Sequence, residues 1–542
     1  MKNKLLSSFT SKINNILTNM KLLFIVSSLA LLSCSNKITP LPDDKIGELI
    51  LNPNGQTPLS LVYKIETNNN YPVTVITEGR LGDENIIHTY PQNYGSNFAI
   101  HGLYSENTNT IHIINGTNRI TTNIIVGKLS IDEIYVPATN RVIRNLEPEE
   151  NVYFFNINDE SSISNLQDNN AEIYFVSPVI NRSQKGVFLM GVSRNGNLRY
   201  VNYSNFYLTN EIAKVINEDN DIVIYDTMGV SDLLGNAKLN AINLDIGIHH
   251  DVIRKNSDSN YIMLANSEWG VEDRICEVDT NGNMIRDLYV GDLIKKIVNQ
   301  NGDEEEKEYL KKLIFDKDNR YYSIGRKKDF PMDWAHCNSL VYDEVNDILY
   351  LSVRSLAVMA VDYSEWELIW YMADDTLDTM ESYNPYGRYL KDIKSLDPYK
   401  VLGDGNIDGP KNQHALFLIS TNIIGMFDNQ GDEEKNPNGS RYIEYKISGS
   451  HGNWKAEKIY EYKTDNKLYS HYVSDIDFLT NGNMLLDFGN NAQIMEVNKD
   501  TREVVYHLKF GIKTWGVYRV DKMPFYYEEN RKYNEDDSFL AN

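Results

Sequence analysis

The sequence predicts an all-β protein, a six-bladed β-propeller preceded by a small β-sandwich domain, and three observations lead to this prediction. The chain of 542 residues holds 36 tyrosines, 32 glycines and 15 prolines, a composition typical of short strands and turns. From about residue 150 onward a hairpin pattern recurs, often around an Asn-Gly pair, which is the strongest short signal for a β-hairpin. The regular return of this pattern indicates a repeat architecture with few free sheet edges.

The charge and composition of the chain exclude several classes of function. Its 53 Lys and Arg residues stand against 76 Asp and Glu residues, which leaves a formal net charge of −23 at pH 7. A nucleic-acid partner is therefore not expected, because phosphate binding needs clustered positive charge. With 41% hydrophobic and 24% charged residues, the chain resembles ordinary globular proteins, which argues against disorder and against a multi-span membrane protein.

The amino-terminal residues 1–33 predict a lipoprotein signal peptide. Residues 2–21 hold four lysines and no acid, and residues 22–32 form an apolar run too short to span a bilayer. The sequence around Cys34 resembles the bacterial lipoprotein processing box, which implies cleavage before Cys34 and lipidation of its sulfur. We therefore expect an exported protein, lipid-anchored to the cell envelope in the periplasm or at the outer membrane. An unlipidated secreted protein is the alternative.

Two folded regions are expected after a polar tether at residues 34–46. The first, residues 47–147, alternates β-rich runs with Asn and Gly turns and predicts the β-sandwich domain. Its clearest runs are Val73–Thr77, Thr110–Ile114 and Asn123–Val126. The second region, residues 148–542, carries the repeated hairpins and predicts the propeller.

The hairpins of the second region recur at spacings of 66 to 86 residues. The residues that mark the repeat are Val192, Val278, Val361, Phe427 and Val497. A sixth blade is expected from residues near 150–190 together with the C-terminus. Because compact blades take about 40–50 residues, the longer spacings predict insertions. These are a charged helical segment at Leu293–Phe315 and a long loop at Asp374–Pro410 that could cover a site.

Three histidine positions combine titratable side chains with a matching place in the repeat. They are His249-His250-Asp251, His336 and His414, and each stands before a β-rich run that leads to a marker residue. Equivalent positions of successive blades point at one central funnel, so we expect the three positions to converge. Adjacent strand residues point to opposite sides, and we expect His250 rather than His249 to face the funnel.

Arg354 ends the run Ile348–Val353, which is apolar enough to form a buried strand. An unpaired guanidinium would be costly in such a place. Two accounts stay open. One is an internal ion pair with an aspartate, and the other is a clamp for an anion, because the planar guanidinium suits sulfate, phosphate or carboxylate.

Several blocks of sequence, taken in order, resemble the bacterial aryl-sulfate sulfotransferase family. They are His249-His250-Asp251, Asp333 to Asp343 continuing to Leu351-Ser352-Val353-Arg354, Gln413-His414-Ala415, Phe427-Asp428-Asn429 and the later Ser440-Arg441. The segments Asn52 to Leu59 and His101 to Tyr104 resemble the small N-terminal β domain of that family. The resemblance covers most of the mature chain and implies a β-sandwich followed by a six-bladed propeller.

The resemblance also implies an activity, the transfer of a sulfuryl group from a phenolic sulfate ester to an acceptor phenol. Such a transferase works by a ping-pong mechanism through a sulfohistidine, without the nucleotide sulfate donor PAPS, a metal or another cofactor. Its catalytic residues would be His414 as the histidine that is sulfated, His336 and Arg354 as groups that hold the sulfuryl oxygens, and His250. Its substrate-binding residues would be Asn338, His249 and Thr514.

Two other functions stay open from the residues. A metal-dependent propeller hydrolase could use as ligands His249, His250, His336, Cys337 and His414, although no pair with the spacing His-Glu-x-x-His or Cys-x-x-Cys is present. A non-catalytic, ligand-binding surface lipoprotein is the other. The sequence leaves open the natural donor and acceptor, the oligomeric state, a homodimer included, and the pairing of Cys276 with Cys337.

Overall fold

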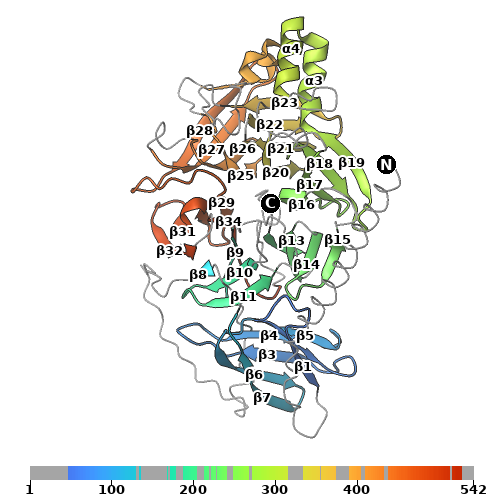
Figure 1. Cartoon of the computed structure of the whole chain (residues 1–542), viewed down its shortest axis with the longest axis vertical. Coiled ribbons are helices and arrows are strands. Elements are labelled where there is room, and N and C mark those ends of the chain that lie inside the picture. The colour runs from blue at the N-terminus through green and yellow to red at the C-terminus, as the bar shows by residue number, and fades with distance from the viewer. Residues whose placement is uncertain are drawn as a thin grey trace, which may run out of the picture.

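The computed structural model shows an all-β fold with several sheets and few helices in the residues that it describes (Figure 1). It describes residues 47–129, 134–135, 168, 171–178, 187–203, 213–218, 221–226, 229–240, 248–267, 272–314, 334–354, 356–373, 390–403, 409–431, 438–512 and 516–527. The predicted signal peptide, the tether with Cys34, and Thr514 lie outside these residues. None of the helices within them is long and apolar enough to cross a membrane.

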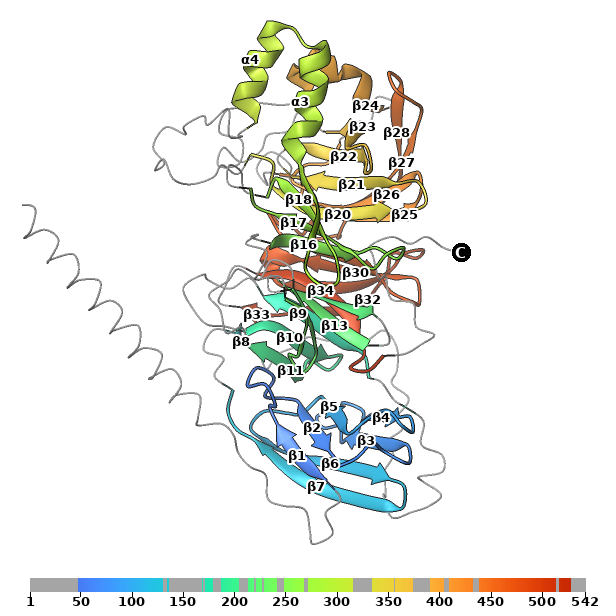
Figure 2. The ribbon, with the colours of Figure 1, turned by 90° about the vertical axis from the view of Figure 1, so that its right-hand side faces the viewer.

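Two antiparallel sheets form the N-terminal end of the molecule (Figure 2). One has the order β1-β2-β5, with β1 at Glu48–Leu51, β2 at Leu61–Lys64 and β5 at Asn97–Ile100. The other has the order β4-β3-β6-β7, with β3 at Val73–Thr77, β4 at Ile86–Tyr90, β6 at Asn107–Asn115 and β7 at Asn118–Val126. The three predicted runs fall in β3, β6 and β7, and both sheets send alternate side chains into one core.

The described residues form six further sheets, most of them meanders. The first joins β9 (Ile173–Pro178), β10 (Val187–Ser193) and β11 (Leu198–Tyr203) to β34 (Val517–Met523), and the second holds β12 (Lys214–Glu218), β13 (Asp221–Asp226), β14 (Gly229–Asp232) and β15 (Ala237–Asn240). The third holds β16 (Ile248–Arg254), β17 (Tyr261–Ala265), β18 (Arg274–Val278) and β19 (Met284–Tyr289), and the fourth β20 (Cys337–Asp343), β21 (Ile348–Val353), β22 (Ala357–Asp362) and β23 (Glu367–Met372). The fifth holds β25 (His414–Ser420), β26 (Ile423–Asp428), β27 (Arg441–Ser448), β28 (Trp454–Tyr462) and β24 (Val401–Gly403), and the sixth β29 (Asp475–Phe478), β30 (Asn483–Phe488), β31 (Gln493–Asn498) and β32 (Val504–Lys509). A separate pair joins β8 (Ile134–Tyr135) to β33 (Gly511–Ile512).

The predicted hairpins are confirmed, but the position of the sixth repeat unit was wrong. Strand β9 does pair with the C-terminal strand β34. Both belong, however, to the sheet of Val192, and the additional sheet is β12–β15, which lies in the 86-residue gap before Val278. Its strands are short and contain no Asn-Gly turn, so the hairpin pattern did not reveal it.

Apolar clusters fill the spaces between neighbouring sheets. One cluster joins the third sheet to the fourth, another the fourth to the fifth, and another the fifth to the sixth. Strands β9, β17 and β30 are buried along their whole length, as expected of strands that are covered on both faces. The strand contacts β34 to β12, β34 to β29, β29 to β25, β25 to β20 and β20 to β16 link successive sheets.

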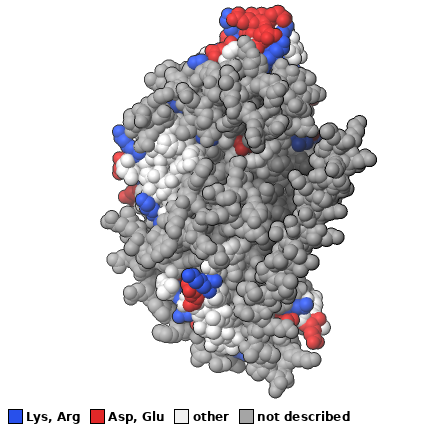
Figure 3. All heavy atoms as spheres, viewed as in Figure 1, with Lys and Arg blue, Asp and Glu red and all other residues white. Residues whose placement is uncertain are grey.

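The predicted helical insertion is confirmed as α3 (Val290–Asn301) and α4 (Glu304–Leu313), at the end opposite the N-terminal sheets (Figure 2). Helix α4 begins after Asp303, whose side chain accepts a hydrogen bond from the Glu306 amide, and acids fill its first turn, where the helix dipole favours them. Figure 3 shows acidic residues gathered at this end of the molecule, with basic residues beside them. In the predicted 374–410 loop, the described part forms the 3₁₀ helices η3 (Leu390–Asp392) and η4 (Lys394–Tyr399) and strand β24.

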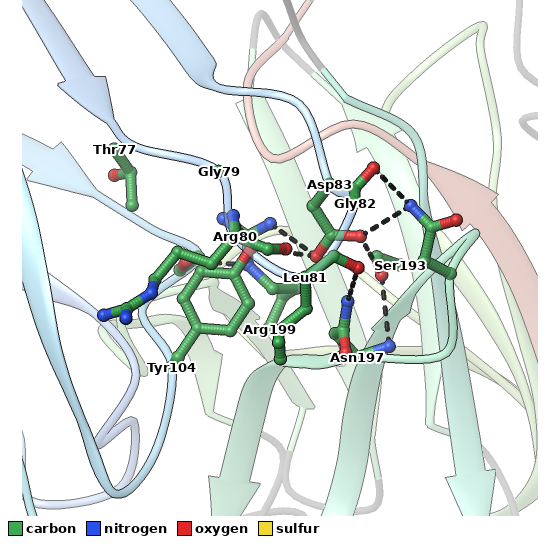
Figure 4. Close-up of polar contacts among 12 residues, drawn as sticks. Thr77, Gly79, Arg80, Leu81, Gly82, Asp83, Tyr104, Ser193, Asn197 and Arg199 are labelled. Atoms are coloured by element: carbon green, nitrogen blue, oxygen red, sulfur yellow. Dashed lines mark hydrogen bonds and ion pairs between the residues drawn. The ribbon is translucent and has the colours of Figure 1, made fainter. Parts of the chain in front are cut away.

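A cluster of polar side chains joins the N-terminal sheets to the first of the six sheets (Figure 4). We call it the Asp83 clasp, and it consists of Asp83, Tyr104, Ser193, Asn195 and Arg199. Asp83 Oδ2 lies 3.0 Å from Arg199 Nη1 and accepts from the Tyr104 hydroxyl at 2.9 Å. Asp83 Oδ1 accepts from Ser193 Oγ at 2.7 Å and from Asn195 Nδ2 at 3.0 Å. The Arg199 guanidinium also lies over the Tyr104 ring, 4.1 Å from its centroid, so both charges of the clasp are paired and covered.

Asp487 in β30 is a fully buried carboxyl whose two oxygens have no hydrogen-bond partner among the described residues. Burial, with a further contribution from Asp475 opposite it, raises the pKa of Asp487 well above its usual value. In the unfolded chain the carboxyl ionises near pH 4, whereas in the folded chain it keeps its proton up to a higher pH. Its contribution to stability is thus complete at low pH and is lost as the pH rises toward the folded pKa.

We expect Asp487→Asn to remove this pH dependence. Relative to the wild type, the variant should gain up to about 1.4 kcal/mol of unfolding free energy for each pH unit from pH 5 upward. Urea unfolding at pH 5 and pH 8 measures the gain. The exposed Asp465→Asn is the control, and equal pH dependence in both variants would contradict the prediction.

Candidate active site

The first strands of three neighbouring sheets position the predicted histidines. His250 lies in β16, His336 stands immediately before β20, and His414 is the first residue of β25. Because β16 packs against β20 and β20 against β25, the three positions lie close in space. The ring centroids of His250 and His336 are 5.1 Å apart, and both rings influence the pKa of His414. The structure thus brings together the three histidine positions that the repeat pattern singled out.

The backbone at these positions adopts the left-handed region of φ. The φ angles are 56° at His250, 56° at Glu272, 53° at His336 and 55° at Asn412. Residues other than glycine rarely adopt this region, and such strained residues cluster at functional sites. Such angles also occur elsewhere in the described residues, so they accompany the histidine positions and do not by themselves identify the site.

Both members of the His249-His250 pair contact one carboxylate. His250 Nε2 lies 2.9 Å from Glu272 Oε2, and His249 Nδ1 lies 3.4 Å from Glu272 Oε1. Regular strand alternation does not hold at this point of β16, and the choice of His250 over His249 to face the funnel stays a prediction. The φ angle of His250 is positive, and the register of β16 against β17 shifts between Ile248 and Val252.

Glu272 is the common partner of three imidazoles, because His336 Nδ1 also lies 3.0 Å from its Oε2. The residue is 4% exposed. Burial opposes its ionisation, but the imidazoles of His250 and His336 outweigh burial and hold the pKa of the Glu272 carboxyl well below its usual range. The loop that carries it is fixed by two hydrogen bonds, from the Glu272 amide to Asn266 Oδ1 at 2.9 Å and from the Cys337 amide to the Glu272 carbonyl at 2.9 Å.

The two histidines nearest to the Glu272 carboxylate, His250 and His336, each contact one further polar side chain. The Tyr518 hydroxyl lies 2.7 Å from His250 Nδ1, and Arg354 Nη1 lies 3.2 Å from His336 Nε2. A guanidinium only donates hydrogen bonds, so His336 Nε2 accepts and the proton is on Nδ1, the nitrogen that lies 3.0 Å from Glu272 Oε2. A connected chain of polar groups thus runs from Tyr518 through His250, Glu272 and His336 to Arg354. The Arg354 guanidinium, which the sequence assigned either to an ion pair or to an anion clamp, is a buried donor to an imidazole here.

His414 differs from the other two histidines in its surroundings. The residue is 2% exposed. Its Nδ1 lies 2.7 Å from Asn429 Oδ1 and 3.1 Å from the Asn412 carbonyl oxygen. Burial, and then the positive charge of Arg354, lower the pKa of His414 well below its usual value. The imidazole of His414 is therefore neutral at pH 7.

Buried polar groups hold the segments on both sides of His414. Arg441 donates to Asp428 Oδ2 from Nε at 3.0 Å and from Nη2 at 2.9 Å, and both side chains are fully buried. Asp428 Oδ1 accepts from the Lys411 amide at 2.9 Å. The Ser440 hydroxyl donates to the Asn429 carbonyl oxygen at 3.0 Å. The later sequence block Ser440-Arg441 therefore holds Asp428 and Asn429 in place next to His414.

Asn338 and Asn412 carry buried polar atoms that have no partner among the described residues. Asn338 Nδ2 donates to the Gln413 carbonyl oxygen at 2.8 Å, whereas its Oδ1 has no partner. The side-chain atoms Oδ1 and Nδ2 of Asn412 also have no hydrogen-bond partner among the described residues. Burying such an atom without a partner costs about 1–3 kcal/mol, so unsatisfied polar atoms require an explanation such as a ligand. Thr514, the remaining predicted substrate-binding residue, lies outside the described part of the chain.

Of the five residues predicted as possible metal ligands, only His249 and His250 belong to a group of potential ligands in the described residues. His249, His250 and Glu272 form one group whose ligand atoms lie within 4.8 Å of one another, and it is the single group of this kind among the described residues. Cys337 and His414 do not belong to it. Cys276 and Cys337 are both buried and free, so the disulfide that the sequence left open is absent from the structure.

Three residues of the cluster escaped the sequence reasoning. Glu272 stands among many acids and Tyr518 among 36 tyrosines, with no local pattern to select either. Asn429 was part of the Phe427-Asp428-Asn429 block, but the block alone assigned it no role. The contacts of all three residues with histidines join different strands or segments of the chain.

An all-β protein in which a buried guanidinium and several imidazoles converge has the donor set of an enzyme that transfers an oxyanionic group. A family model described as arylsulfotransferase (ASST) matches residues 143–519, and the chain belongs to this family.

Two curated relatives, each named arylsulfate sulfotransferase AssT, are similar to parts of the chain. The relative from Escherichia coli O6:H1 (strain CFT073) is 25% identical over 191 residues, which are 31% of this chain and 30% of the relative. The relative from Lelliottia amnigena is 24% identical over 260 residues, which are 43% of this chain and 42% of the relative. The matched regions thus span less than half the length of either relative. A solved structure of a protein of unknown function from Bacteroides caccae aligns with a TM-score of 0.36 and 8% identity, over 65% of this chain and 99% of its own.

Proposed function

We propose that the protein is an aryl-sulfate sulfotransferase that moves a sulfuryl group from a phenolic sulfate ester to an acceptor phenol, with His414 as the transient carrier. The observation that carries this proposal is the neutral, buried imidazole of His414 beside Arg354, in a chain of the arylsulfotransferase family. The oxygens of a sulfate monoester repel an anionic nucleophile, and a neutral imidazole avoids this repulsion. Histidine is among the side chains that form covalent intermediates in enzymes.

The first half-reaction transfers the sulfuryl group to the enzyme. A ring nitrogen of His414 attacks sulfur, an N–S bond forms, and the S–O bond to the aryl oxygen breaks with its electron pair on the phenolate. The protonated imidazole of His250 donates a proton to the leaving phenolate and becomes neutral. Arg354 and His336 hold the sulfuryl oxygens and offset their charge, as donors do in phosphoryl transfer.

The second half-reaction returns the enzyme to its starting state. The oxygen of the acceptor phenol attacks sulfur, and its proton passes to the imidazole that gave one up before. The N–S bond then breaks with its electron pair on His414. Protons and charges balance over the cycle, which is ping-pong and uses neither a metal nor a nucleotide sulfate donor.

We further propose the architecture and location that the sequence predicts. The six consecutive sheets would be the blades of a propeller, and the pairing of β9 with β34 would join the two ends of the chain in one blade. The two N-terminal sheets would form a β-sandwich domain within residues 47–147, held to the first blade by the Asp83 clasp. The exported, lipid-anchored location rests on the signal peptide and Cys34.

An assay with a chromogenic aryl sulfate tests the function. Purified full-length protein is incubated with the sulfate ester and a phenol, in buffer that contains neither PAPS nor added metal. Release of the chromogenic phenol and sulfation of the acceptor are expected, and initial rates at several acceptor concentrations should give the parallel double-reciprocal lines of a ping-pong mechanism. Release that requires PAPS, or stoichiometric zinc together with loss of activity on chelation, would contradict the proposal.

We expect Glu272→Gln to lower kcat/KM about 10²-fold. The new amide nitrogen cannot accept from an imidazole N–H, so at least one of the contacts to His249, His250 and His336 must break. Steady-state kinetics with the chromogenic ester measures the loss.

Glu277→Gln is the matched control for this variant. Glu277 is 3% exposed and accepts hydrogen bonds from Lys255 and Tyr363, but it touches none of the three histidines in the described structure. Its replacement should lower stability and leave kcat/KM near that of the wild type. Equal losses of kcat/KM in the two variants would mean that the charge of Glu272 has no specific part in the site.

A further inference from the structure

Asn429 contacts His414 on one side and main-chain carbonyl groups on the other. Its Nδ2 donates to the carbonyl oxygens of Ser470 at 2.9 Å and Val473 at 3.0 Å. Carbonyl oxygens only accept hydrogen bonds, so the amide nitrogen of Asn429 has to face them. The amide oxygen Oδ1 is therefore the atom that faces His414 Nδ1, at 2.7 Å.

A second oxygen that cannot donate lies near the same ring nitrogen. The carbonyl oxygen of Asn412 is 3.1 Å from His414 Nδ1. Two acceptors around one nitrogen require that this nitrogen carries the proton. In a neutral imidazole the lone pair is then on the other nitrogen, Nε2.

The orientation of Asn429 is itself fixed. The residue is fully buried, and its carbonyl oxygen accepts from the Ser440 hydroxyl at 3.0 Å. The same hydroxyl accepts from the Ser470 amide at 2.8 Å, which ties together the two segments that flank the asparagine. Turning the amide over would place its oxygen against two carbonyl oxygens and its NH₂ group against an imidazole N–H, so the opposite orientation would lose the side-chain hydrogen bonds with Ser470, Val473 and His414.

We propose that Asn429 is a positioning residue that selects the Nδ1–H tautomer of His414 and thereby makes Nε2 the nitrogen that forms the N–S bond. The mechanistic half of this inference rests on the proposed function, whereas the tautomer itself does not. When Nε2 attacks sulfur, the S–O bond to the aryl group breaks, the phenolate leaves, and the ring becomes a cation that keeps its Nδ1 proton. The hydrogen bond to Asn429 Oδ1 strengthens as this charge develops, so it favours the transition state over the ground state.

Kinetics of the first half-reaction tests the catalytic part. In Asn429→Ala the rate of the phenol burst should fall on the order of 10²-fold, with KM for the aryl sulfate nearly unchanged, because the alanine leaves the groups that hold the sulfuryl oxygens in place.

Asn69→Ala is the matched control. Asn69 is also buried, donates from Nδ2 to two carbonyl oxygens, those of Tyr71 and Pro91, and accepts at Oδ1 from the Gly95 amide, but it lies in the connection between β2 and β3. Its replacement should lower the midpoint of thermal unfolding and keep the wild-type burst rate. A wild-type burst in Asn429→Ala would overturn the positioning role.

The nitrogen-15 spectrum of selectively labelled histidines tests the tautomer directly. The His414 signals are identified by their loss in His414→Gln. In the wild type at neutral pH we expect a protonated Nδ1 and an unprotonated Nε2, and in Asn429→Ala a mixture of both tautomers. An Nε2–H tautomer or an imidazolium in the wild type would overturn the inference. A wild type with the expected tautomer but no sulfuryl transfer would overturn the proposed function and leave the tautomer assignment standing.

Discussion

Replacing His414 by alanine is expected to lower kcat/KM for sulfuryl transfer on the order of 10³-fold or more, the largest effect on activity in this protein. The reason is that the variant has no nitrogen to carry the sulfuryl group between the two phenols, and the other imidazoles are already engaged with Glu272. Release of the chromogenic phenol measures the loss. Mass spectrometry of the wild type, mixed with donor in the absence of acceptor, should show one added sulfuryl group on the peptide that contains His414.

Two controls separate lost chemistry from lost structure. His112 is a buried histidine of the N-terminal sheets, bonded to Glu78 and Thr121, and His112→Ala should keep near-normal turnover. His414→Gly leaves room at the site, and added imidazole should restore part of its activity. If His414→Ala turned over aryl sulfate at nearly the wild-type rate, the assignment of the carrier would be wrong.

Replacing Asp83 by alanine is expected to destabilise the folded protein by about 3–5 kcal/mol, the largest effect on stability. The change leaves the Arg199 guanidinium, whose side chain is 1% exposed, as a buried charge without its carboxylate. It also removes the acceptor of Ser193, Asn195 and Tyr104 at the junction with the N-terminal sheets. The midpoint of urea unfolding, followed by tyrosine and tryptophan fluorescence, measures the effect.

The double replacement Asp83→Ala with Arg199→Met should be less destabilised than Asp83→Ala alone, because it removes the unpaired charge as well. Asp287→Ala is the matched control. It breaks an ion pair with Arg274 of similar geometry, but Asp287 is 40% exposed, and exposed pairs contribute about 0–1 kcal/mol. Equal losses of unfolding free energy in Asp83→Ala and Asp287→Ala would show that burial of the Asp83 clasp does not increase its contribution to stability.

Much of the fold could be predicted because hairpins are local. The Asn195-Gly196 and Asn281-Gly282 turns each lie between strands that pair with each other, and both glycines have the positive φ that such turns require. The helical insertion was equally readable from its charge pattern. The sheet β12–β15 was not, because its short strands carry no marked turn and periodicity is weak in segments of four to six residues.

The candidate site divides in the same way. His336 and His414 were found because each directly precedes or begins the first strand of a sheet, a position that the sequence displays. The choice of His250 over His249 stays a prediction, and strand alternation is a weak basis for it, since alternation assumes a regular backbone and the positive φ of His250 breaks it. A left-handed φ at a residue other than glycine leaves no signature in the residue type, so sequence reasoning had no means to find it.

The sequence by itself determined which groups are available for chemistry and their order along the chain: three histidine positions, one arginine and the hairpins that carry them. Only the tertiary structure decided which groups meet. The contact of Tyr518 with His250 depends on β34 returning to pair with β9, and the tautomer of His414 depends on the carbonyl groups beyond Asn429. Such contacts join residues far apart in the chain, and their geometry is set by strand register and packing between sheets, which no local pattern encodes.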